Sequence, residues 1–358
     1  MLGRRRWLAS TALGALFVGG GARADVRGLP HVALGGLPTR VSAHAELAAR
    51  LGLGSLHVKR DDEGGDVFGG SKARKLEHLL ADARARGHRS VLTFGGAGSN
   101  HALATAIHAR RLGLRAHLVL LPEPPSARVR AHLYAALDAG ATLHAGTRAH
   151  RDDPSRAVAD FAPRDAPYVI APGGTSPLGT AGYVAAGLEL AAQVAAGALP
   201  RPDVVYVAAG TTGTAAGLWI GLEAAGLATR LVAVRASGPG TASRARVAAE
   251  IEATQRLLRA SGSSLAPTPL ETRFVLEHRF AGDGYARPSA AGRAASATVG
   301  AELPLDPTYT EKAFAALIAT APRGAAVLFW HTFDARLPPA GAARARDLPA
   351  GLRGYARG

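Results

Sequence analysis

Lysine is rare in this sequence, which makes each lysine a candidate for amine chemistry. The chain has 358 residues and a formal net charge of +15, yet its only lysines are Lys59, Lys72, Lys75 and Lys312. The guanidinium of arginine keeps its proton at ordinary pH, whereas the amine of lysine can lose it and form a Schiff base. A lysine kept in so arginine-rich a chain is therefore a candidate for covalent attachment to a carbonyl compound.

Glycine-rich turns stand next to residues that could bind an anion. Lys72 follows Gly69-Gly70 at the start of a helical pattern, where it could clamp a phosphate or lie at a solvated helix start. A second turn runs from Gly95 to His101 and ends in Ser-Asn-His at an expected helix start. Unpaired N–H groups there could bind a carboxylate or phosphate, although an ordinary N-cap is the alternative.

Two further turns of this kind come later in the chain. The segment 172–179 holds no titratable group and could be a plain connector. The segment 209–217 offers Thr211, Thr212 and Thr214 just before an expected helix, which is typical of an anion cradle. It lacks the Gly-Lys-Ser/Thr of a P-loop and the full dinucleotide fingerprint, and a Gly/Thr-rich connector remains the alternative.

Strand and helix patterns alternate around these turns. We expect strands over 90–95, 115–121, 168–171, 203–208, 231–235 and 325–331, and helices over 101–112, 127–139, 181–196, 242–260 and 312–319. Such alternation predicts an α/β fold with a largely parallel sheet and helices on its faces. The turns then lie at strand–helix junctions, where open α/β sheets bind ligands. Residues 336–358 show no clear period, and we expect a loosely ordered tail.

Composition sets limits on the class of protein. The length of 358 residues suggests two domains or one large one, and the 47% of hydrophobic residues can form sizeable cores. The absence of cysteine excludes disulfides, thiolate zinc sites and iron–sulfur clusters, and we predict no metal site. The positive charge comes from dispersed arginines without interleaved aromatics, so a codon bias explains it better than a nucleic-acid partner.

The first 24 residues have the pattern of a signal peptide. Arg4-Arg5-Arg6 precedes a short apolar stretch, and Ala22-Arg23-Ala24 offers small residues at a cleavage site before Asp25. The arginines resemble a twin-arginine signal, and the stretch is too short for a stable membrane anchor. We expect an exported, periplasmic protein; a misread start codon or an ordinary extension is the alternative.

In their order and spacing, these motifs resemble one enzyme family. The motifs are Lys59–Asp62, Gly69–Glu77, Gly95-Gly96 with Ser99–His101, Gly173-Gly174, Gly210–Thr214, Leu305–Lys312 and His331-Thr332. They resemble the D-cysteine desulfhydrase and 1-aminocyclopropane-1-carboxylate deaminase family of tryptophan-synthase-β-like pyridoxal-phosphate enzymes. The resemblance implies two open, mostly parallel sheets. It implies a large cofactor domain (25–74 and 186–335) and a small domain (75–185).

The resemblance also implies a role for each matching residue. Lys72, and not Lys75, would carry pyridoxal 5′-phosphate. Gly210, Thr211, Thr212, Gly213 and Thr214 would hold the phosphate, and Asn100 would bond the ring's 3-hydroxyl. Ser99, Asn100 and His101 would bind the substrate carboxylate. Tyr285 and Tyr309 would line the reacting face, with ordinary buried tyrosines as the alternative. Either Lys72 or a serine such as Ser99 could move protons, and the serine could instead attack as a nucleophile.

Two positions distinguish the branches of this family. The deaminases resemble a pattern with Glu after the second tyrosine and Leu after the late histidine, where this chain has Thr310 and Thr332. Thr310 would face the pyridine nitrogen, where a hydroxyl supports expulsion of a thiolate better than opening of a cyclopropane; a helix cap is the alternative role. His101 in place of Gln favours the same branch. We therefore expect elimination from D-cysteine to give pyruvate, sulfide and ammonia.

The chain departs from the family pattern at several positions. Ser71, Gly98 and the pair Phe333-Asp334 replace the usual Asn, Gln and Gly-Gly. The bulk of Phe333-Asp334 could narrow the cofactor pocket. The alternatives are therefore a 1-aminocyclopropane-1-carboxylate deaminase, or an exported amino-acid-binding protein without turnover. We expect a small-molecule substrate, no stable membrane span and a homodimer.

Overall fold

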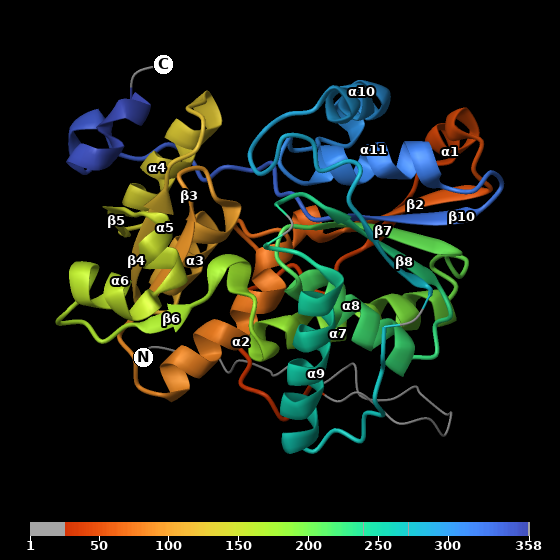
Figure 1. The fold of residues 1–358 in the computed structure, drawn as a ribbon, viewed down its shortest axis with the longest axis horizontal. Helices are drawn as coiled ribbons and strands as arrows, with labels where there is room; N and C mark the ends of the chain where they lie inside the picture. The colour runs from red at the N-terminus through yellow and green to blue at the C-terminus, as the bar shows by residue number, and fades with distance from the viewer. Residues whose placement is uncertain (1–25, 239, 271, 357–358) are drawn as a thin grey trace, which may run out of the picture.

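Two β-sheets form the framework of the protein (Figure 1). The computed structural model describes residues 26–356 except 239 and 271. The larger sheet has the strand order β1 (Val41–Ala43), β2 (Ser55–Arg60), β10 (Ala326–His331), β7 (Val204–Ala209), β8 (Arg230–Arg235) and β9 (Phe274–Glu277). Its neighbouring strands are parallel except for the pair β1–β2.

The smaller sheet is parallel throughout. Its order is β5 (Thr142–Ala145), β4 (Arg115–Leu121), β3 (Ser90–Gly96) and β6 (Tyr168–Ile170). The predicted α/β fold with two mostly parallel sheets is thus confirmed. The strands predicted from continuous apolar runs are present within about two residues of their expected ends, as buried parallel strands should be.

Helices cover both faces of the larger sheet (Figure 1). The α-helices are α1 (Ala45–Leu51), α2 (Ser71–Ala85), α3 (Asn100–Arg111), α4 (Ala127–Asp138), α5 (Arg148–Asp152), α6 (Pro154–Phe161), α7 (Pro177–Ala195), α8 (Gly213–Ala224), α9 (Arg244–Ala260), α10 (Ala290–Val299) and α11 (Thr310–Thr320). Side chains of α7, α8 and α9 share one core with the sheet, and α1, α10 and α11 share another on the opposite face.

Helices α7 and α8 approach each other at glycines. A Cβ on Gly187 would lie 2.9 Å from the Cα of Gly221, and a Cβ on Gly217 would lie 2.5 Å from the Cβ of Tyr183. Close packing of these two backbones fixes the first turn of α8 beside α2, which also packs on α7. The expected boundary at 185–186 falls inside α7, whose Ala181 and Val184 already belong to the core of the larger sheet.

A buried ion network ties the start of α2 to the larger sheet. Arg74 donates to both oxygens of Asp61, at 2.9 and 2.7 Å, and to Glu189 at 2.8 Å. Trp330 Nε1 and the Tyr183 hydroxyl also donate to Asp61, at 2.7 and 2.9 Å. Burial alone would raise the pKa of Asp61, but Arg74 overcomes it and holds that pKa below its usual value. The Lys59–Asp62 motif is therefore a structural support for the lysine turn.

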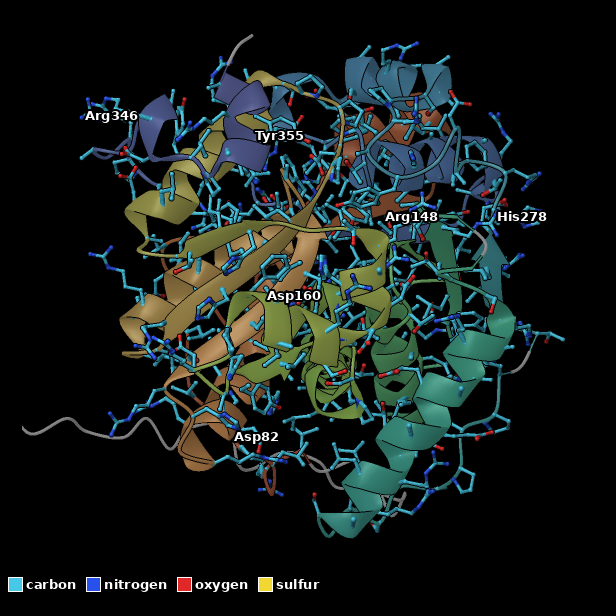
Figure 2. The ribbon with its side chains drawn as sticks, turned by 60° about the vertical axis from the view of Figure 1, so that its left-hand side comes forward. Asp82, Arg148, Asp160, His278, Arg346 and Tyr355 are labelled. Atoms are coloured by element: carbon cyan, nitrogen blue, oxygen red, sulfur yellow. The ribbon has the colours of Figure 1, made fainter. Side chains whose placement is uncertain are left out.

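The C-terminal segment packs against the helices around the smaller sheet, which differs from the expected loose tail. It forms the 3₁₀ helix η5 (Ala350–Ala356), and Leu348 and Leu352 are buried in the core with α2, α3 and α4. The Tyr355 hydroxyl accepts from the backbone N–H of Glu123 at 2.9 Å and donates to its carbonyl at 3.0 Å. Figure 2 labels Tyr355 on this segment. Single leucines and a tyrosine anchor it, which no periodic pattern reveals.

The expected signal peptide lies outside the described residues. Within the part of the chain that the structure describes, no helix has the length and apolarity to cross a membrane.

Candidate active site

Lys72 lies in the first turn of α2, where two glycines set its position. Gly69 and Gly70 have φ of +153° and +52°, and a Cβ on Gly70 would lie 2.7 Å from the carbonyl oxygen of Thr332. The Lys72 amine donates to the Ser71 hydroxyl at 2.9 Å and lies 6.0 Å from the centre of the Tyr309 ring. Burial lowers the pKa of Lys72 to about 8, against the opposing pull of Asp306. This amine loses its proton near pH 8 and not near the usual lysine value, which suits a Schiff-base lysine.

The first turn of α8 combines backbone donors and hydroxyls. The side chain of the N-cap residue Thr212 makes no capping hydrogen bond within the described part of the chain, and both Thr212 and Thr214 are buried. A Cβ on Gly210 would lie 2.5 Å from the Tyr309 ring, so the loop leaves room only for glycine. The turn at 172–174 also belongs here, because the Thr175 hydroxyl donates to the Thr211 hydroxyl at 2.6 Å.

Lys75 faces the same turn of α8, which the sequence analysis did not predict. Its amine lies 3.3 Å from the Gly173 carbonyl and 3.4 Å from the Thr175 hydroxyl, and a Cβ on Gly213 would lie 3.0 Å from it. Burial and, second, the charge of Lys72 lower the pKa of Lys75 to about 7. The spacing of three residues between Lys72 and Lys75 could have predicted that both amines lie at the same site, because residues three apart share a helix face.

These groups fit a phosphate ester. An uncapped helix start supplies N–H donors and a favourable dipole, and the threonine hydroxyls and the Lys75 amine supply further donors. The lysine suited to a Schiff base lies on the neighbouring helix, across the Tyr309 ring. The donor set thus matches pyridoxal phosphate, with Lys72 for its aldehyde and the start of α8, together with Lys75, for its phosphate.

The start of α3 presents Ser99, Asn100 and His101 in different roles. The Ser99 hydroxyl caps the helix by accepting from Ala102 N–H at 3.3 Å. The Asn100 side-chain oxygen accepts from Arg128 at 2.9 Å. The structure therefore brings the three residues to one helix start, but Ser99 carries a capping role as well.

His101 is held in one tautomer by its neighbour. The Thr93 hydroxyl gives its proton to the Ile170 carbonyl at 2.9 Å, so the 2.9 Å contact between Thr93 and His101 Nε2 requires the proton on Nε2. Burial, followed by the two lysines, holds the pKa of His101 well below its usual value. Its Nδ1 is then a buried acceptor that has no partner among the residues that the structure describes. The His101 side chain has no donor left for the substrate carboxylate. The backbone N–H groups at this helix start can donate to that carboxylate instead.

Tyr285 and Tyr309 meet at one wall of the site. Their ring centres are 5.9 Å apart and their planes are inclined by 74°. Desolvation raises the pKa of both phenols, which therefore stay protonated at neutral pH, although 38% of Tyr285 is exposed. A Cβ on Gly96 would lie 3.4 Å from the Tyr285 ring, so this tyrosine also faces the turn before α3.

Thr310 is engaged by Asp306. Its hydroxyl donates to Asp306 Oδ1 at 2.8 Å and accepts from the Asp306 N–H at 2.7 Å. The hydroxyl therefore caps the turn that leads into α11, which is the alternative role considered for Thr310, and it donates its proton in a hydrogen bond to the Asp306 carboxylate. Toward a ring nitrogen Thr310 can offer a neutral oxygen only.

Glu123 is a second residue that the sequence analysis missed. Its carboxyl group lies against the turn before α3, since a Cβ on Gly96 or Gly98 would collide with it at 1.9 and 2.6 Å. Burial raises the pKa of Glu123 to about 7, although Gly98 N–H and Arg128 favour the charged form. No motif marks this residue, because a long-range contact brings it to the site.

The fold and the site together define a pyridoxal-phosphate enzyme of the two-sheet type. The family described as "Pyridoxal-phosphate dependent enzyme" matches residues 32–332. The chain belongs to this family and uses pyridoxal phosphate, as predicted.

Named relatives place the chain among enzymes of amino-acid chemistry. It is 40% identical to the nocardicin C-9′ epimerase of Nocardia uniformis subsp. tsuyamanensis, over 86% of this chain and 94% of the relative. It is 34% identical to the D-cysteine desulfhydrase of Yersinia pestis (strain Pestoides F), over 81% and 87% of the two chains. A solved structure described as an ACC deaminase homologue matches with a TM-score of 0.71 and 29% identity, over 86% and 93%. The predicted family of deaminases and desulfhydrases is thus confirmed.

Proposed function

We propose that the protein removes the α-proton of a small amino acid and expels its β-substituent, with D-cysteine as the substrate. The supporting observation is the neutral Thr310 hydroxyl, bonded to Asp306, at the position where the deaminase pattern has a glutamate. D-Cysteine and water would give pyruvate, hydrogen sulfide and ammonia. Thiolate is a good leaving group, since the pKa of a cysteine thiol is about 8.5.

The residues of the chain divide the work as follows. Pyridoxal phosphate, when bound, supplies the electron-withdrawing ring that makes the α-proton acidic. The backbone N–H groups at the start of α3 bind the substrate carboxylate. Lys72, whose pKa is lowered to about 8, takes the α-proton, and the protonated phenol of Tyr309 beside it can protonate the leaving thiolate.

Epimerisation is the second candidate, favoured by the 40% identity to the nocardicin epimerase. It shares the removal of the α-proton but returns a proton to the opposite face and releases nothing. A panel of both enantiomers of small amino acids, assayed for keto acid, sulfide and inversion, separates the two. Keto acid and sulfide from D-cysteine support elimination, whereas inversion without release would replace it. Cofactor binding without either reaction would favour a binding protein.

The side chain at 310 gives a second test of the branch. Thr310→Glu with Thr332→Leu should move activity from D-cysteine toward 1-aminocyclopropane-1-carboxylate. Wild-type turnover of the cyclopropane substrate as fast as that of D-cysteine would contradict the proposed role of Thr310.

We propose two further properties that follow from the sequence. Twin-arginine export should place the mature chain, beginning at Asp25, in the periplasm, and Arg4→Lys with Arg5→Lys should keep it in the cytoplasm. Intact Met1 on protein recovered from cells, without a periplasmic fraction, would contradict this. A homodimer is expected, and light scattering measures it directly.

A further inference from the structure

Phe333 and Asp334 lie between the turn that presents Lys72 and helix α4. Each side chain makes a specific contact there. Their side chains are buried, with 6% and 2% of the residue exposed. Asp334 accepts from the Gly69 N–H at 3.0 Å, on the turn that presents Lys72. The Phe333 ring carries the guanidinium of Arg128, whose Cζ lies 4.4 Å from the ring centre. The pair that departs from the family pattern therefore connects the lysine turn to α4.

Arg128 reaches from this ring to Asn100. Its Nη2 donates to the Asn100 side-chain oxygen at 2.9 Å and to the Asp334 carbonyl at 3.4 Å. A guanidinium has donors only, so it selects the oxygen end of the amide. The Nδ2 of Asn100 is thereby turned away from Arg128, and no described residue provides it with an acceptor.

The guanidinium is also a fixed positive charge at this point of the site. The charges of Asp306, Asp334 and Glu123 act on this guanidinium and favour its charged form. Arginine stays charged even when partly buried, and its plane stacks on an aromatic ring in a way that lysine cannot reproduce. Arg128 thus holds both the orientation of Asn100 and a positive charge behind it.

We propose that Arg128, carried on Phe333, is a positioning residue that turns the Asn100 amide to donate into the cofactor site. Asn100 is the residue expected to face the 3-hydroxyl of pyridoxal phosphate. Donors and a nearby cation stabilise the ionised form of such an oxygen, which lowers the pH at which the bound cofactor takes up its proton. The inference depends on the cofactor and on Asn100, and not on which amino acid reacts.

The test is a pH titration of the absorbance of the protein loaded with pyridoxal phosphate, without substrate. Arg128→Met should move the midpoint upward by about one pH unit, because a cation near the titrating group is lost. Phe333→Leu should move it less in the same direction, since Arg128 loses its platform. Arg130→Met, on the same helix, removes the same formal charge elsewhere and should keep the wild-type midpoint.

Three results would overturn the proposal. The first is a wild-type midpoint in Arg128→Met while Asn100→Ala shifts it. The second is an equal shift in Arg130→Met, which would indicate net charge alone. If circular dichroism shows that Arg128→Met does not fold, Arg128→Lys replaces it, because lysine keeps the charge but lacks the planar guanidinium. A wild-type midpoint in Arg128→Lys is the third result. None of these readouts needs turnover, so an inactive enzyme on D-cysteine leaves the test intact.

Discussion

Lys72 and Lys75 lie one turn apart on α2 and face different halves of the cofactor site. Lys72 points to the Tyr309 ring, whereas Lys75 lies against Gly173, Thr175 and the start of α8. Burial lowers the pKa of both, to about 8 and about 7. One helix thus presents two amines, and we propose that Lys72 receives the aldehyde of the cofactor and Lys75 its phosphate.

The two lysines should fail differently when replaced. Lys72→Ala should abolish the Schiff-base absorbance of the bound cofactor. Lys75→Met should keep that absorbance and weaken cofactor affinity by about tenfold or more, which corresponds to one charge-assisted hydrogen bond. Absorbance spectra and equilibrium dialysis measure the two effects. Borohydride labelling of Lys75 or Lys312 in the wild type would show that the assignment is wrong.

The lowered pKa of Lys72 sets a pH dependence for cofactor capture. Only the neutral amine attacks an aldehyde, so the rate at which the apoprotein captures pyridoxal phosphate should rise with pH and level off above about 8. Stopped-flow absorbance measures this rate. A midpoint near 10.5, the usual lysine value, would contradict the desolvated position of the amine.

Glu123 should make substrate binding weaker in alkaline solution. Its pKa is raised to about 7, so above that pH a negative charge stands beside the turn that is expected to bind the substrate carboxylate. KM should rise severalfold between pH 6 and 8, because like charges at close range repel. Glu123→Gln should flatten the KM profile. A profile that keeps its rise in this variant would exclude Glu123 as the cause.

Asp61 should be essential to stability. Asp61→Asn leaves Arg74 and Lys59 short of a buried counter-charge, and we expect a loss of about 3 kcal/mol in the free energy of unfolding. The pKa of Asp61 is lowered in the folded state, so its contribution is present above about pH 4 and is lost as the pH falls below that value. Urea unfolding at several pH values measures both effects.

A matched control for this variant is Asp66→Asn. Asp66 pairs with Arg111 at 3.3 Å on the surface, with 55% of its side chain exposed. Exposed ion pairs contribute little, so the control should cost about 0.5 kcal/mol or less. Equal losses in the two variants would contradict a special role for the buried network.

The sequence predicted those features that depend on a single helix, strand or turn. It did not predict contacts that form where several elements meet. Apolar runs predicted strands such as β3 and β4, and Ser99-Asn100 correctly marked the start of α3. The position of Lys75 depends on α2, the 172–174 turn and α8 coming together. The tautomer of His101 depends on the hydrogen bond that Thr93 on β3 donates to the Ile170 carbonyl on β6. Such contacts follow from tertiary packing and leave no trace in periodicity.

The η5 segment fastens the loop before α4 to the C-terminal part of the chain. Tyr355 closes it on the backbone of Glu123, and Leu352 seats it in the core of the smaller sheet. Removal of residues 349–356 would therefore do two things at once: open the core and release the loop that carries Glu123. Tyr355→Phe releases only the loop, so comparing the two alterations separates anchoring of the domain from control of the site's charge.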